Sequence, residues 1–157
     1  MTQQIALELF TGELFPLLEE TFERVHGIYL DKGTSLFETL DTITAEEASR
    51  PVSARCASIA GQVEHVRFYL QVLQEYMQQK ALGKVDWAAS WYLKTVTPEE
   101  WEALKQRLKL TYQDLTALVK SLETWQGENE LGGALAIVVH TAYHLGEIRQ
   151  ALCTIKA

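Results

Sequence analysis

The chain has 157 residues, of which 47% are hydrophobic and 22% charged, as is typical of a soluble protein with one globular domain over residues 1–157. The formal net charge of −7 and the dispersed basic residues argue against nucleic-acid and membrane partners. No apolar stretch reaches the roughly 18–20 residues that cross a bilayer, and Met1–Gln4 do not begin a signal peptide, so we expect a cytoplasmic protein with Cys56 and Cys153 as reduced thiols.

The first predicted helical region covers residues 3–28, where apolar side chains recur at helical spacing. Pro16 lacks a backbone N–H, so we expect it in the first turn of a helix that starts near Gly12, after a short separate turn or a kinked extension. Two short helices should follow, one over residues 34–40 and one that opens with the capping-box pattern of Thr44–Glu47.

The second long helix is predicted over residues 57–79, with Ser58 or Ser53 as its N-cap. Its inward stripe consists of Gln62, His65, Val66, Tyr69, Val72, Leu73 and Tyr76. A connection that carries Trp87 and Trp91 follows this helix.

The third long helix has the clearest start in the chain. Thr97–Glu100 offers an N-cap hydroxyl, a proline at N1 and a glutamate at N3, and the apolar face continues to about Glu123. A polar loop then leads through Gly132 and Gly133 into the last predicted helix, over residues 134–152. The fold class is therefore predicted to be all-α, a four-helix bundle with short extra helices between the first and second long helices.

A pair of histidines four residues apart, His140 and His144, lies in the last of these helices, and such residues share one helix face. That face carries Ile137, His140, His144, Ile148, Ala151 and Ile155. Both rings are thus expected to face the core, as is His65 of the second long helix. A buried polar ring that lacks a partner loses roughly 1–3 kcal/mol, so each imidazole needs one.

A divalent metal ion would be a partner that all three rings share, since imidazole is the commonest protein metal ligand. Three imidazoles from two helices leave coordination positions open, which is typical of a catalytic site rather than a closed structural one. The predicted metal ligands are His65, His140 and His144. The alternative is a set of core histidines that tyrosine hydroxyls and backbone carbonyls satisfy.

Glu147 continues the same helix surface, one turn beyond His144. It is a candidate fourth ligand, an acceptor for an imidazole N–H, or a catalytic base for metal-bound water. The alternative is a solvated carboxylate paired with Arg149 or another basic residue.

The remaining histidine and the aromatic residues have simpler interpretations. His26 lies at the end of the first helical region, where a histidine favours the helix dipole, and we expect that role rather than ligation. Trp87, Trp91 and Tyr69 are either core residues or the lining of a pocket above the metal.

Two segments resemble those of a known family. The stretch Ser58–His65 is similar to a serine–isoleucine motif that ends in histidine, and His140–Arg149, with its two histidines followed by Gly146 and Glu147, is similar to a C-terminal signature. Both belong to the DinB-like (DinB/YfiT) metalloprotein superfamily, which this chain resembles in its helical layout as well.

The resemblance implies a four-helix bundle of up-down-down-up type with a long crossover, often a homodimer. It implies that His65, His140 and His144 bind zinc, nickel or another divalent ion. Family members include transferases and isomerases that use a low-molecular-weight thiol, which the metal activates as a thiolate. The chain departs from the family at Glu147, where glutamine is frequent, so the mechanism of any one member does not transfer directly.

The function predicted from these residues is that of a metal-dependent enzyme acting on a small-molecule substrate. The ion would activate a small thiol for transfer to an electrophile, as the resemblance implies, or a water molecule for hydrolysis. The alternative is a non-catalytic dimeric bundle, a binding module with a vestigial or absent metal site. Nucleic-acid binding is suggested only by the family name and is opposed by the acidic charge.

Overall fold

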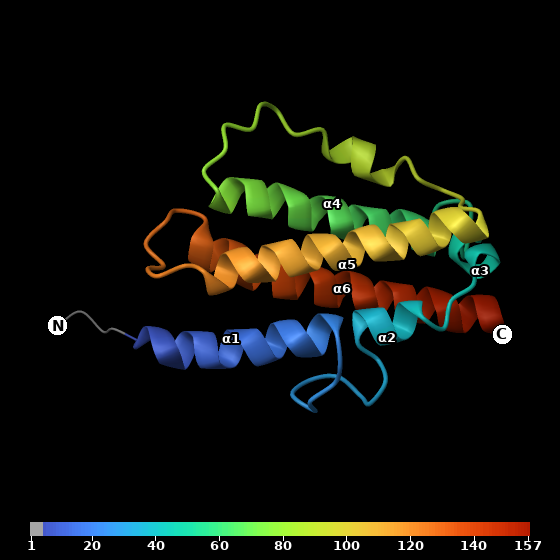
Figure 1. Ribbon diagram of the computed structural model, residues 1–157. Coiled ribbons are helices and arrows are strands. Elements are labelled where there is room, and N and C mark those ends of the chain that lie inside the picture. Colours follow the sequence, from blue (N-terminus) through green and yellow to red (C-terminus); the bar gives the residue numbers. More distant parts are fainter. Residues whose placement is uncertain (1–4) are drawn as a thin grey trace. The chain divides into compact units, whose positions relative to one another are not determined.

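The computed structural model describes residues 5–157, so residues 3 and 4 of the first predicted helical region lie outside the described residues. All regular elements in that range are helical (Figure 1): α1 (Leu7–Phe22), α2 (Leu36–Leu40), α3 (Ala45–Ser49), α4 (Ile59–Met77), the 3-10 helix η1 (Trp87–Trp91), α5 (Pro98–Lys120) and α6 (Glu130–Lys156). The all-α prediction is confirmed. None of the helices described is both long enough and apolar enough to cross a bilayer.

The chain divides into two compact units, Met1–Thr42 and Ile43–Ala157. Helices α1 and α2 belong to the first unit, and the other elements belong to the second. A single domain and a four-helix bundle would both require α1 to join the long helices of the second unit, so these two statements stay predictions.

Helix α1 runs through Pro16 without a break, so the expected helix start near Gly12 is wrong. Proline removes one helical hydrogen bond and crowds the preceding turn, which disfavours a helix interior by about 3 kcal/mol. Leu14 and Leu18, on either side of it, are both buried. Burying two leucines is worth about 3–6 kcal/mol, which is enough to offset that loss.

Helix α1 ends at Phe22 rather than near residue 28, because the backbone that follows the helix forms hydrogen bonds with the side chain of Glu20. Its buried carboxylate accepts four backbone N–H bonds, at 2.6 to 2.9 Å, from His26, Ile28, Tyr29 and Leu30. Burial acts to raise the pKa of Glu20, but these hydrogen bonds outweigh it and lower the pKa to about 2. The loop 26–30 is therefore built around a negative charge.

In the second unit, α4 contacts α5, α6 and η1. Helices α4 and α5 run in the same direction, because the segment 78–97 returns along α4 before α5 begins, and α6 runs the opposite way (Figure 1). The core of this unit includes Trp101 of α5, which is 1% exposed and whose indole N–H donates to the carbonyl of Ile43 at 2.8 Å. This arrangement has the order of directions and the long crossover expected for the last three long helices.

The start signals of the helices were predicted well where a side-chain cap marks them. Ser58 caps α4, Thr97 caps α5, and Thr44 caps α3 in a capping box with Glu47. Helix α6, however, begins at Glu130, so the expectation of a loop through Gly132 and Gly133 is wrong. A Cβ atom on Gly133 would lie 2.7 Å from Met77 Cε, so the end of the Met77 side chain packs against this glycine.

Candidate metal centre

The three predicted histidines come together inside the second unit. His65 lies on α4, His140 and His144 lie on α6, and one nitrogen from each falls within 4.8 Å of the others. The Nε2 atoms of His65 and His140 are 3.1 Å apart. Two nitrogen ligands bound to one ion at 2.0–2.1 Å are separated by about 2.9–3.4 Å, so this pair already has the spacing of a shared ion.

The hydrogen bonds of His65 fix which of its nitrogens carries the proton. Its Nδ1 lies 2.7 Å from the Ser90 hydroxyl, and that hydroxyl donates its only proton to the carbonyl of Trp87 at 2.7 Å. Ser90 must therefore accept from His65, so the proton sits on Nδ1. The lone pair of Nε2 is left facing the other two histidines, as a metal ligand requires.

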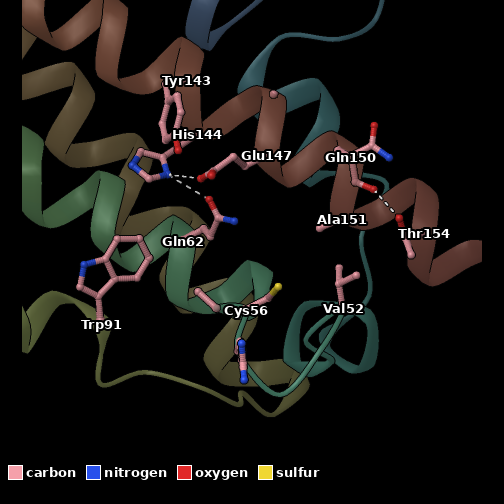
Figure 2. Close-up of a pocket in the computed structure, with 13 residues that line it drawn as sticks. Val52, Cys56, Gln62, Trp91, Tyr143, His144, Glu147, Gln150, Ala151 and Thr154 are labelled. Carbon is pink, nitrogen blue, oxygen red and sulfur yellow. Dashed lines mark hydrogen bonds and ion pairs between the residues drawn. The ribbon is translucent and has the colours of Figure 1, made fainter.

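Two hydrogen-bond acceptors likewise determine which nitrogen of His144 carries the proton. Its Nδ1 lies 3.0 Å from Gln62 Oε1 and 3.1 Å from Glu147 Oε2, and Figure 2 shows both side chains pointing at this nitrogen. An N–H between two oxygens donates, so the lone pair of the neutral ring is on Nε2. Glu147 thus lies behind the ring, as one of the alternatives from the sequence predicted, and it is not part of the nitrogen cluster.

His140 differs from the other two. Because His65 Nε2 is an acceptor, His140 Nε2 donates to it in the metal-free protein, and within residues 5–157 the buried Nδ1 of His140 has no hydrogen-bond partner. An unpaired buried nitrogen is unfavourable, and an ion bound through Nε2 would leave Nδ1 of this ring unpaired as well. The ring is held instead by Tyr69, which stacks on it with centroids 3.6 Å apart and planes 8° apart.

The segment between α4 and α5 covers one side of this cluster. It contributes Ser90 and also Trp91, whose ring stacks on His65 at 3.9 Å between centroids and 17° between planes. The segment can lie this close because α4 has a glycine beneath it. A Cβ atom on Gly61 would come within 2.8 Å of the carbonyl oxygen of Leu93.

The electrostatic environment keeps the three rings neutral near pH 7. Burial, with the charge of His144, lowers the pKa of His65 to about 4, although Glu147 acts in the opposite direction. Burial and the charges of His144 and His65 lower the pKa of His140 to about 3. Burial also lowers the pKa of His144 against the raising effect of Glu147. Neutral imidazoles are the form that binds a metal ion.

These shifts predict that the metal-free protein loses stability as the pH falls from about 6.5 towards about 4. In that window the unfolded chain, with histidine pKa values near 6.5, takes up protons that folded His65 and His140 refuse, since their pKa values are about 4 and about 3. Denaturant unfolding in the presence of a chelator measures the effect. The pH dependence should be smaller in His140→Gln and unchanged in His26→Gln, and equal slopes in all three proteins would contradict the prediction.

The fourth histidine, the tryptophans of the segment 78–97 and the two cysteines lie outside the histidine cluster. His26 lies beyond the end of α1 and pairs with Glu19 at 3.2 Å, so it does not act at a helix terminus. Trp87 contacts Phe68 and Tyr69 and does not line the pocket beside His144, whereas Trp91 does. Both free cysteines, Cys56 and Cys153, are exposed.

A pocket of about 870 Å³ opens beside His144. It is lined by the loop before α4, by Gln62 and Trp91, and by α6 from Tyr143 to Thr154 (Figure 2). Ser90 and the contribution of the loop before α4 could not be predicted from the sequence, because neither lies in a periodic segment or a recognisable motif. Gln62 was placed on the inward stripe, but its bond to His144 depends on the packing of α4 against α6.

Comparisons with models of known protein families, with curated proteins and with solved structures gave no match, and the family resemblance of the two sequence segments stays a prediction.

Proposed function

We propose that this protein binds one divalent metal ion through His65, His140 and His144 and uses it for chemistry on a small molecule. The observation that carries the proposal is the convergence of three imidazole nitrogens within 4.8 Å, with the opposite nitrogens of His65 and His144 already hydrogen-bonded. Metal-binding histidines generally donate their other N–H to an oxygen in this way. Three neutral imidazoles suit zinc or nickel, and they leave positions for a substrate.

A divalent ion held there would supply Lewis acidity, which lets a small thiol or a water molecule lose its proton near neutral pH. Glu147 lines the pocket, and we assign it the acid–base role. Its carboxylate lies 3.1 Å from His144 Nδ1, and its hydrogen bond and charge raise the pKa of Tyr143. Glu147 therefore also holds the His144 ring in place through the N–H that it accepts.

The DinB-like resemblance supports a thiol transferase reaction, because all three histidines fall within the two segments that resemble the family. In such a reaction a low-molecular-weight thiol passes its proton to Glu147, its sulfur bonds to the electrophilic carbon of the small molecule, and the bond from that carbon to its leaving group breaks, so that the leaving group departs with the electron pair and takes up the proton. A four-helix bundle, a homodimer and a cytoplasmic location form part of the same proposal. Hydrolysis, with water in place of the thiol, uses the same residues.

Metal analysis of the purified protein, followed by thermal unfolding with zinc, nickel or a chelator, tests the proposal. We expect about one ion per chain and a raised unfolding temperature with metal, because an ion at a hundredfold excess over its Kd stabilises by about 2.7 kcal/mol. Substoichiometric metal and no thermal shift would instead favour the non-catalytic binding module.

A further inference from the structure

The pocket beside His144 is lined by two oppositely charged side chains, of which one has partners within the protein. Of the residues that line it, Arg55 is the one arginine or lysine and Glu147 is the one carboxylate. Glu147 is engaged by His144 and by the Tyr143 hydroxyl. Arg55 is exposed in the loop before α4, and its guanidinium makes no ion pair or hydrogen bond to any residue in the described range 5–157. The guanidinium of Arg55 therefore has no anionic partner in the part of the chain that the structure describes.

The proposed metal ion would add to this positive charge. Three neutral imidazoles bring no negative charge to a divalent ion, and the single carboxylate nearby already accepts two hydrogen bonds. The pocket would then be cationic, whereas the chain as a whole has a net charge of −7. Such a local reversal of sign selects anionic ligands, because the rest of the surface repels them.

The chemistry of arginine narrows the class of ligand. A guanidinium presents its N–H groups in a planar fork that matches both oxygens of a carboxylate. The pocket volume of about 870 Å³ is within the range of small-molecule sites, and the pocket is lined by both Arg55 and His144, but not by His65 or His140. Trp91 and Tyr143 add aromatic side chains to the lining of the same pocket.

We propose that the substrate is a small carboxylate, whose carboxylate group pairs with Arg55 while its other end lies at His144, the member of the histidine cluster that lines the pocket. This inference rests on the proposed function, and it adds the substrate class and a residue that determines specificity. Arg55 binds the substrate and takes no part in holding the metal.

Two hydroxamates that differ by a carboxylate test this inference on the zinc-loaded protein. Acetohydroxamate binds a metal ion without an anionic tail, and succinic acid monohydroxamate carries a carboxylate at its far end. By calorimetry, the wild-type protein should bind the carboxylate probe about tenfold more tightly, equivalent to about 1.4 kcal/mol. In Arg55→Gln this preference should disappear, while the affinity for acetohydroxamate and the zinc content stay unchanged.

Arg107→Gln is the matched control, since it removes the same charge from an exposed position on α5 outside the pocket. It should keep the tenfold preference. Equal binding of the two probes by the wild-type protein, or a preference that survives in Arg55→Gln, would overturn the inference. Failure of the proposed function looks different, because zinc would then be absent and acetohydroxamate would not bind. In that case the carboxylate probe, titrated into wild-type and Arg55→Gln protein, still reports whether Arg55 binds the anion.

Discussion

Replacing His144 by alanine is expected to lower the affinity for zinc or nickel by more than about 100-fold. Loss of the residues that merely orient a metal-binding histidine already weakens binding by about 10–100-fold, and removing the ligand itself should exceed that. The variant also leaves Gln62 and Glu147 without the N–H that both accept. Competition with a chromophoric chelator measures the affinity, and metal analysis gives the stoichiometry.

Since His144 is 5% exposed, its loss also leaves a cavity, and the variant needs a folding control. His140→Gln, a substitution of similar size, should lose metal to a comparable degree with an unchanged far-ultraviolet spectrum. His26→Ala removes a histidine outside the cluster and should bind as the wild-type protein does. Full metal binding by both His144→Ala and His140→Gln would refute the three-histidine site.

The second large effect is expected at Glu20, where a glutamine should destabilise the protein by about 2–4 kcal/mol. The glutamine amide offers one oxygen where the carboxylate has two, so its NH₂ group would face backbone N–H donors of the loop 26–30. About two of these part-buried donors would lose their acceptor, at about 1–2 kcal/mol each, the lower part of the range for a group left unpaired. Denaturant unfolding at neutral pH measures the difference.

The pH dependence of this variant provides an independent check. The pKa of Glu20 is lowered to about 2, so its contribution is present above the ordinary glutamate range and is lost as the pH falls towards 2. The difference between wild-type and Glu20→Gln protein should therefore shrink in acid. Glu13→Gln makes the same change at an exposed position of α1 and should alter stability by less than about 0.5 kcal/mol. A similar small effect at Glu20 would contradict the role of the carboxylate.

The parts of the structure that local signals determine were predictable from the sequence. Thr97 and Pro98 mark the start of α5 because capping and a preset φ angle act within one turn. The convergence of His65 with His140 and His144 followed from helical spacing, since each lies on the apolar stripe of its helix. Such stripes must face one another to be buried.

The parts that depend on contacts between distant segments were not predictable. Ser90 reaches His65 only because the segment 78–97 returns along α4 over Gly61, and nothing in its own sequence indicates that path. The end of α1 at Phe22 depends on Glu20, which looks in the sequence like an ordinary glutamate of a helix. Its role becomes clear only from the hydrogen bonds that the loop 26–30 donates to it. The continuation of α1 through Pro16 likewise depends on packing rather than on local preference.

The stacked and hydrogen-bonded rings of the histidine cluster have a consequence for how strongly a ligand could be held. Trp91 and Ser90 restrain His65, and Gln62 and Glu147 restrain His144, so the torsional freedom of both side chains is already lost when the chain folds. Immobilising such a side chain during association would otherwise reduce affinity by about 0.5–1.5 kcal/mol. The entropic cost of ordering these two side chains is therefore part of the free energy of folding and lowers the stability of the second unit. The site is in turn already rigid before a ligand binds.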